Sequence, residues 1–330
     1  MPRTALTQSV EFMDCWTDGI SNQLARDVFV GLTSKQKTIP SKYFYDSRGS
    51  KLFEEICRLP EYYVTRVEMA LLKDRAHRIM RYFHQGDLVE LGSGANWKIR
   101  MLIDALDEKA RVRTRYVPVD VSETAILESV NELVDLYPEL SVMIVVADFT
   151  RDLRRLPNDG PKLMLFLGST IGNMNTEESV SFLTSVAQCL VPGDRFLLGL
   201  DMVKPPKILE AAYDDAKGIT ADFNRNMLHV VNRELDANFS PDHFDHLAFF
   251  NEEEEQVEMH LKANRRMRVD ISDIDLTATF EKGETILTEI SRKFTRESAQ
   301  SMIEQSGLEV AQWHQDPKGW FALADLCRAD

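Results

Sequence analysis

The order of apolar and polar residues predicts alternating strands and helices through the middle of the chain. Short, nearly continuous apolar runs of the kind that form buried strands occur at residues 88–91, 115–120, 143–146, 163–167 and 195–200. Apolar residues at helical spacing predict helices at residues 68–83, 99–106, 122–136 and 176–190. Apolar strands that alternate with helices form parallel sheets covered on both faces, so we expect an α/β fold with a doubly wound, Rossmann-like sheet.

The two flanks of this region follow a different pattern. Before it, helices are predicted at 20–35 and 51–58, within a stretch that is otherwise irregular and rich in aromatic residues. After residue 201, we expect helices across 206–233, extended strands across 249–269 and 277–294, and a return to α/β order at 297–306, 308–313 and 320–324. The simplest organisation is a sheet domain of residues 67–201 and 294–330, and a second, smaller α+β domain that joins residues 1–66 to 202–293.

Composition and charge narrow the classes of partner. The chain has 330 residues and a net charge of −14, from 39 Lys and Arg against 53 Asp and Glu. Nucleic acids and anionic membranes are bound through basic faces, so we expect neither as a partner. The four cysteines are far apart, which predicts no metal site and the reduced thiols of a cytoplasmic protein. The sequence shows no signal peptide and no apolar run long enough to span a bilayer. We expect the protein to be a monomer.

The sharpest local motif is Val-Glu-Leu-Gly-Ser-Gly at residues 89–94. Two glycines after a strand let the backbone approach a ligand at the start of the next helix. A dinucleotide-binding fingerprint needs a third glycine at the position that Trp97 occupies, which disfavours an NAD-dependent oxidoreductase. A glycine turn with an acid on the strand before it instead resembles motif I of class I S-adenosylmethionine-dependent methyltransferases.

Three further strand ends carry residues suited to a ligand. Asp120 closes one predicted strand, Asp148 and Phe149 close the next, and Asn173 lies in the Gly-Ser-Thr-Ile-Gly-Asn loop that follows a third. Ligands of open α/β sheets bind beyond the carboxyl ends of the strands, so these positions converge. A helix cap is the simpler interpretation for either aspartate alone, but the ordered set favours a cofactor site.

Beyond these motifs, residues 20–325 resemble the histidine Nα-methyltransferases of ergothioneine biosynthesis. The strings that carry the resemblance lie at residues 42–46 (KYFYD), 59–63 (LPEYY), 168–173 (GSTIGN), 213–216 (YDDA), 223–226 (FNRN) and 287–291 (LTEIS). The resemblance implies trimethylation of the α-amino group of L-histidine to hercynine, with S-adenosylmethionine as the cofactor and no metal. It also implies that the second domain binds the substrate. The donor loop departs from the pattern at residues 95–97 but keeps Lys98.

The resemblance implies a role for each matching position. The residues matching cofactor contacts are Tyr45, Gly92, Lys98, Asp120, Asp148 and Phe149. Asn173 and Tyr213 match the residues that hold the substrate carboxylate, and Tyr62 lies near its amino end. Tyr62 and Asn173 are thus the catalytic candidates, with Tyr62 an orienting group rather than a base. The remaining substrate positions are an imidazole-binding pair, Glu289 and Ser291, and the cavity residues Thr220, Phe223 and Met259.

The chemistry of Glu289 and Ser291 supports a preference for histidine. Imidazole offers one N–H donor and one acceptor, and a carboxylate together with a hydroxyl can form hydrogen bonds to both ring nitrogens. Indole has only a donor, so enzymes that methylate tryptophan should not need this pair. Residues two apart on a strand face the same side, which lets both reach one ring. Without the resemblance, a solvent-facing pair on an edge strand would be the simpler interpretation.

Several alternatives stay open at this point. The aromatic strings at 42–46 and 59–63 form either a wall over a ligand or a packed cluster. His243 and His246 have a spacing found in metal sites, but their polar surroundings predict surface histidines. The runner-up functions are a methyltransferase for another amino acid such as tryptophan, an NAD-dependent oxidoreductase, and a binding protein without catalysis.

Overall fold

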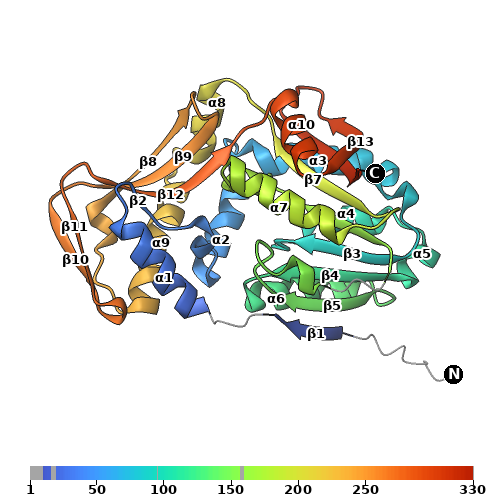
Figure 1. The fold of residues 1–330 in the computed structure, drawn as a ribbon, viewed down its shortest axis with the longest axis horizontal. Coiled ribbons are helices and arrows are strands. Elements are labelled where there is room, and N and C mark those ends of the chain that lie inside the picture. Colours follow the sequence, from blue (N-terminus) through green and yellow to red (C-terminus); the bar gives the residue numbers. More distant parts are fainter. Residues whose placement is uncertain (1–9, 16–19, 95, 157–159, 330) are drawn as a thin grey trace.

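The computed structural model describes residues 10–15, 20–94, 96–156 and 160–329. Within this part of the chain, two sheets form the two lobes seen in Figure 1, one with eight strands and one with four. A separate two-stranded hairpin extends from the smaller lobe. No helix of the described part is long and apolar enough to cross a membrane.

The large sheet has the strand order β1-β5-β4-β3-β6-β7-β14-β13. Its strands are, in chain order, β1 (Val10–Asp14), β3 (Gly86–Leu91), β4 (Thr114–Asp120), β5 (Ser141–Val146), β6 (Lys162–Phe166), β7 (Arg195–Asp201), β13 (Leu308–Gln315) and β14 (Phe321–Arg328). The strands from β1 to β7 pair in parallel, while β14 runs antiparallel to both of its neighbours. The chain order reverses between β3 and β6, which opens a crevice at the carboxyl ends of these strands.

Helices cover both faces of the large sheet. Neighbouring residues such as Leu88 and Val89 belong to opposite cores, as expected for strands with two buried faces. The first core includes apolar residues of α3 (Tyr63–Ile79), α4 (Trp97–Asp104), α5 (Glu108–Val112) and α6 (Glu123–Leu136). The second core includes residues of α7 (Thr176–Cys189) and α10 (Arg296–Gln305). The predicted Rossmann-like sheet is therefore confirmed.

The smaller lobe is built from segments far apart in the sequence. Its sheet has the order β2-β12-β9-β8, with strands β2 (Lys37–Thr38), β8 (Phe244–Asn251), β9 (Gln256–Ala263) and β12 (Thr285–Arg292). The hairpin consists of β10 (Met267–Ile271) and β11 (Leu276–Phe280), and the helices are α1 (Ile20–Thr33), α2 (Ser47–Cys57), α8 (Pro206–Tyr213) and α9 (Ile219–Leu235). Apolar residues of α1, α9 and β9 share one core, so the two segments fold together.

Two features of the N-terminal region differ from the expected pattern. Residues 10–14 pair with β5 at the edge of the large sheet, although the expected division places them in the second domain. A five-residue strand is stabilised by this pairing, which local periodicity does not reveal. Helix α2 begins earlier than expected because the Asp46 side chain accepts a hydrogen bond from Gly49 N–H and caps it. Residues 1–9 of the expected second domain lie outside the described residues.

Candidate active site

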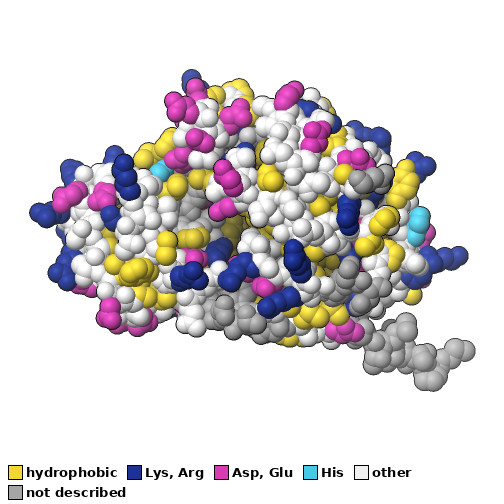
Figure 2. All heavy atoms as spheres, in the orientation of Figure 1, with side chains coloured by type: hydrophobic (Ala, Val, Ile, Leu, Met, Phe, Trp, Pro, Cys, Tyr) yellow, Lys and Arg dark blue, Asp and Glu magenta, His cyan; other side chains and the backbone are white. Residues whose placement is uncertain are grey.

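The carboxyl ends of the parallel strands bring the predicted cofactor residues to one edge of the large sheet. Of these predicted residues, Gly92 follows β3, Asp120 ends β4 and Asp148 follows β5. Gly168, which begins the loop that contains Asn173, follows β6 at the same edge. Gly92 and Gly168 have positive φ angles of 73° and 77°, a backbone region that side chains disfavour. The surface is hollowed between the two lobes, as Figure 2 shows.

Asp120 ties the glycine turn to β4. Its carboxylate accepts a hydrogen bond from Ser122 N–H at 3.0 Å, and backbone N–H groups of Ser93 and Gly94 also donate to it. Burial raises the pKa of this carboxyl, although these hydrogen bonds oppose the rise. The glycine turn is thus held by the acid predicted to bind ribose.

The next strand end combines a carboxylate with a ring, as predicted. Asp148 accepts a hydrogen bond from Thr150 N–H at 3.0 Å, and Lys42 Nζ lies 3.9 Å from its Oδ2. The Phe149 ring packs edge-on against Phe166, with 5.3 Å between the ring centroids. A Cβ atom on Gly92 would lie 3.7 Å from the Phe149 ring, so the turn and the ring border the same space.

Lys98 is held by a residue that the sequence analysis missed. Its Nζ lies 2.7 Å from Oε2 of Glu68, whose side chain is fully buried. The other carboxylate oxygen of Glu68 accepts a hydrogen bond from Gly168 N–H at 2.7 Å. Glu68 thus joins the loop after β6 to the helix after β3. A sequence signal was present, because Glu68 occupies an inward position of α3, four residues after the buried Val64.

The aromatic residues of the two N-terminal strings meet in one cluster with rings from the insertion. The Tyr45 ring contacts those of Phe53 and Phe223, with centroid distances of 5.5 and 5.7 Å. Tyr62 lies between Phe53 and Tyr213, at 6.2 Å from each. Phe53 was not among the site residues predicted from the sequence. Burial raises the pKa of Tyr62 well above its usual value, so this phenol keeps its proton, in accord with an orienting role.

Strand β12 presents alternate side chains to the junction of the two lobes. Asn173 donates hydrogen bonds to Glu289 Oε1 at 3.0 Å and to the carbonyl oxygen of Ile290 at 2.7 Å. The hydroxyls of Tyr213 and Ser291 are hydrogen-bonded at 2.7 Å. The expected substrate residues therefore lie together. The alternative of a solvent-facing pair is wrong, because Ser291 is buried and the Asn173 side chain covers the edge of β12 at Ile290.

A register shift in β12 falls just before Glu289. Such bulges turn a side chain relative to a regular strand. Thr288 points away from the junction and donates hydrogen bonds to Asn224 Oδ1 and to the carbonyl oxygen of Met259. Burial raises the pKa of Glu289 to about 7, while the Asn173 hydrogen bond and the charge of Lys293 oppose that rise.

The three predicted cavity residues come from two elements. Met259 is the β9 residue directly opposite Glu289, and opposite residues of an antiparallel pair share a face. Thr220 and Phe223 lie on α9, and all three side chains are buried. Phe223 belongs to the aromatic cluster, whereas Thr220 lies at the start of α9 and its N–H donates to Asp215 Oδ1 at 2.7 Å.

His246 corrects one expectation of the sequence analysis. It is not a surface residue: its Nε2 donates to the carbonyl oxygen of Tyr213 at 2.8 Å, and its Nδ1 lies 2.9 Å from Asn224 Nδ2. Burial lowers its pKa, and the neutral ring suits both contacts. The strand position, not the flanking polar residues, decides its burial. No group of three or more His, Cys, Asp or Glu residues in the described ranges is arranged to hold a metal ion.

Comparisons with known proteins agree with this geometry. The model of the family described as "Histidine-specific methyltransferase, SAM-dependent" matches residues 24–328. The chain is 44% identical over 308 residues to a histidine N-alpha-methyltransferase of Mycolicibacterium smegmatis, covering 93% of this chain and 95% of that protein. For the histidine N-alpha-methyltransferase of Mycobacterium tuberculosis, the identity is 43% and the coverage 91% and 94%. Ergothioneine biosynthesis protein 1 of Schizosaccharomyces pombe is 28% identical, over 84% of this chain and 37% of that protein. The chain belongs to the family of histidine-specific, S-adenosylmethionine-dependent methyltransferases.

Proposed function

We propose that the protein transfers methyl groups from S-adenosylmethionine to the α-amino nitrogen of L-histidine. The product is hercynine, the trimethyl betaine of histidine, made as a step of ergothioneine biosynthesis. The observation that carries the proposal is the placement of Glu289 and Ser291 on one face of β12, beside Asn173 and Tyr213. Asn173 and Tyr213 are neutral groups suited to a carboxylate. Glu289 and Ser291 are a donor–acceptor pair suited to an imidazole, and they border the same site.

The residues at the large sheet fit S-adenosylmethionine. We propose that Asp120 accepts hydrogen bonds from the ribose hydroxyls and that Asp148 and Phe149 border the adenine. Tyr45, Gly92 and Lys98 complete the proposed set. Ser93 adds an independent sign of a ligand, because its buried hydroxyl has no hydrogen-bond partner among the described residues. The cofactor supplies an electrophilic methyl group when bound.

The protein contributes to the reaction mainly by orientation. Asn173 and Tyr213 hold the carboxylate of histidine, and Tyr62 borders its amine. Both N–H groups of Asn173 are bonded in this structure, so one of them turns from Glu289 to the carboxylate when histidine binds. Glu289 and Ser291 bind the imidazole, while Thr220, Phe223 and Met259 shape the cavity. Fixing the amine in line with the methyl carbon replaces a bimolecular encounter with a preorganised one. Aromatic rings such as Tyr45 also stabilise methylated ammonium groups by cation–π contact.

We also propose that the enzyme acts in the cytoplasm as a monomer, without nucleic-acid or membrane partners. Cys57, Cys189 and Cys327 are free thiols in separate elements, as suits a reducing compartment. The net charge of −14 disfavours phosphate-rich partners. We further propose the division into a cofactor domain and a substrate domain, with residues 10–14 assigned to the cofactor domain.

Mass spectrometry of the products tests the proposed function. The purified protein is incubated with S-adenosylmethionine and either L-histidine or L-tryptophan. We expect trimethylated histidine and no methylated tryptophan, because indole cannot satisfy both Glu289 and Ser291. Methylation of tryptophan alone would overturn the assigned substrate. Cofactor binding without any amine product would indicate a binding protein.

A further inference from the structure

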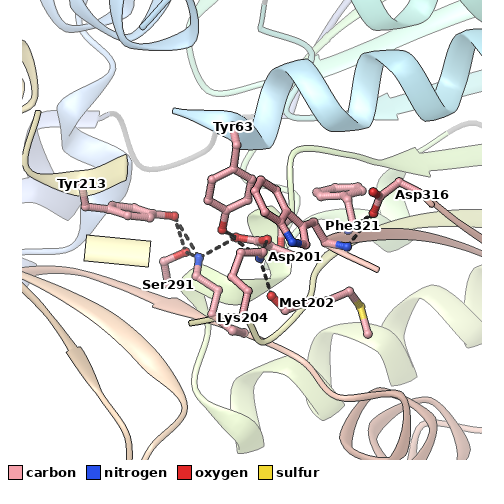
Figure 3. Close-up of polar contacts among 11 residues, drawn as sticks. Tyr63, Asp201, Met202, Lys204, Tyr213, Ser291, Asp316 and Phe321 are labelled. Atoms are coloured by element: carbon pink, nitrogen blue, oxygen red, sulfur yellow. Dashed lines mark hydrogen bonds and ion pairs between the residues drawn. The ribbon is translucent and has the colours of Figure 1, made fainter. Parts of the chain in front are cut away.

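A lysine that the proposed reaction does not use lies directly behind two of its binding groups. Lys293 is fully buried, and its Nζ lies 3.0 Å from Tyr213 Oη, 2.7 Å from Ser291 Oγ and 2.9 Å from Asp201 Oδ2. An ammonium group has three N–H donors, so these three contacts use all of them. Figure 3 shows the side chains of Tyr213 and Ser291 close together, with Asp201 and Lys204 to one side of them.

The contacts of Lys293 limit what the two hydroxyls can do. Tyr213 Oη and Ser291 Oγ each accept one N–H of Lys293. They also lie 2.7 Å from each other, so one of the two hydroxyl protons lies between them. Only the other proton can point to a ligand. If Tyr213 donates to a carboxylate, Ser291 must donate to Tyr213, and Ser291 can then only accept from the ligand.

We propose that Lys293 is a positioning residue that couples the hydroxyls of Tyr213 and Ser291 and offsets the negative charge of the substrate carboxylate. This inference rests on the proposed function, because it takes histidine as the ligand. Asn173 and Tyr213, the proposed carboxylate contacts, are both uncharged. The charged group that contacts Tyr213 is the Lys293 ammonium, whose Nζ lies 3.0 Å from Tyr213 Oη.

The surroundings keep the Lys293 side chain charged. Burial alone would lower the pKa of Lys293, but Asp201 and Tyr213 raise it above its usual value. Asp201 also pairs with Lys204, so a single carboxylate lies between two ammonium groups. The Lys293 ammonium is therefore a charged group directly behind the Tyr213 hydroxyl. In a buried site such a charge is weakly screened and favours a nearby anion.

Lys204 provides a matched control. Its side chain is also buried, and it pairs with the same carboxylate of Asp201. Its other contacts are Tyr63 Oη at 2.9 Å and the carbonyl oxygen of Met202, as Figure 3 shows. Replacing either lysine by methionine removes one buried cation from Asp201. Only the Lys293 replacement removes a contact to Tyr213 and Ser291.

Calorimetry on the full-length protein separates a positioning role from a structural one. The affinities of L-histidine, L-histidinol and S-adenosylhomocysteine are measured for the wild type, Lys293→Met and Lys204→Met. Histidinol keeps the imidazole and the amine but has no carboxylate. We expect Lys293→Met to weaken histidine binding about 10- to 100-fold, the range for hydrogen bonds to charged groups. Histidinol binding should fall much less, and S-adenosylhomocysteine binding should stay within about twofold.

Each result decides the proposal. Equal losses for histidine and histidinol, or equal losses in both lysine variants, would reduce Lys293 to a structural residue. A wild type that does not bind histidine overturns the proposed function itself, which is a separate outcome. If Lys293→Met does not fold, Lys293→Gln retains two N–H donors without the charge and gives the same comparison.

A double-mutant cycle provides a second readout. Because Lys293 is proposed to act through Tyr213, its replacement should matter less once the Tyr213 hydroxyl is gone. We therefore expect Lys293→Met and Tyr213→Phe to be non-additive in their effects on histidine affinity. Additive effects would contradict the coupling.

Discussion

Asn173 and Glu289 are hydrogen-bonded across the junction of the two lobes. The amide Nδ2 of Asn173 lies 3.0 Å from Glu289 Oε1, and the two residues are 116 positions apart in the sequence. Asn173 ends the loop that follows β6 of the large sheet, whereas Glu289 belongs to β12 of the smaller one. The contact therefore links a residue proposed to hold the substrate carboxylate to a residue proposed to bind the imidazole.

The Glu289 side chain is expected to determine affinity for histidine but not for the cofactor. Glu289→Ala should weaken histidine binding about 10- to 100-fold, because the hydrogen bond between the Glu289 carboxylate and the imidazole ring is lost. Calorimetric titration with histidine and with S-adenosylhomocysteine measures both affinities, and Glu253→Ala on the exposed β8–β9 turn is a surface control. An unchanged histidine affinity would exclude the imidazole-binding role.

Glu289 should also make the stability of the ligand-free protein depend on pH. Its folded pKa is raised to about 7, from an ordinary value of 4.5, so the folded state binds the proton more tightly than the unfolded chain does. Its stabilising contribution is present below pH 4.5 and is lost as the pH rises through about 7. The loss is at most about 3 kcal/mol, since Glu289 is partly open to solvent.

Glu289→Gln removes this titration while keeping an acceptor for Asn173. As the pH rises from 4 to 8, the wild type should lose stability and the variant should not. The free energy of unfolding of the variant should therefore increase relative to that of the wild type over this range. Chemical denaturation across that range measures the difference. Burial also raises the pKa of Glu90 to about 7, but Glu90 is present in both proteins. Its contribution to the pH dependence is therefore the same in each and drops out of the difference. Parallel pH profiles for the two proteins would contradict the prediction.

Glu68 should affect the affinity for the cofactor, although we assign it no direct contact with the cofactor. It links Lys98 to the backbone of Gly168 through its two carboxylate oxygens. Glu68→Gln keeps the shape but removes the charge that pairs with Lys98. We expect weaker S-adenosylhomocysteine binding, by about tenfold, because buried pairs lose more than surface pairs when one partner is removed. Replacing Glu54 of α2, which pairs with Arg58 just after the helix, should leave this affinity unchanged.

The Gly172 position should tolerate no side chain. A Cβ atom there would lie 2.8 Å from the carbonyl oxygen of Arg292 in β12. Gly172→Ala should therefore push the loop away from β12 and break the Asn173–Glu289 contact. We expect a higher KM for histidine with an almost unchanged affinity for S-adenosylhomocysteine. Steady-state kinetics test this, and an unaltered KM would show that the loop adjusts without loss.

The His246 ring should support the position of Tyr213 through its backbone. His246 donates to the Tyr213 carbonyl and faces the amide of Asn224. His246→Ala removes both contacts and should raise the KM for histidine several-fold, because Tyr213 loses a fixed neighbour. The nearby His243→Ala is the control, since His243 ends a short helical turn before β8. Equal effects of the two substitutions would contradict this role.

The sequence alone determined the architecture of the cofactor half and the identity of the family. Strands and helices were predictable because the spacing of apolar residues reflects which faces are buried, and this spacing is local. The glycine turn at Gly92 and the acids Asp120 and Asp148 were predictable for a related reason. Parallel strands end at one edge, so residues at strand ends must meet there.

Contacts between distant residues were decided only by the tertiary structure. No local pattern indicated that Asn173 would bond to Glu289, that residues 10–14 would join the large sheet, or that Lys293 would lie fully buried behind Tyr213. A lysine or histidine in a polar stretch resembles a surface residue until its neighbours are known. Burial of polar groups depends on partners that other segments supply, and only the packing of the two lobes brings those partners together.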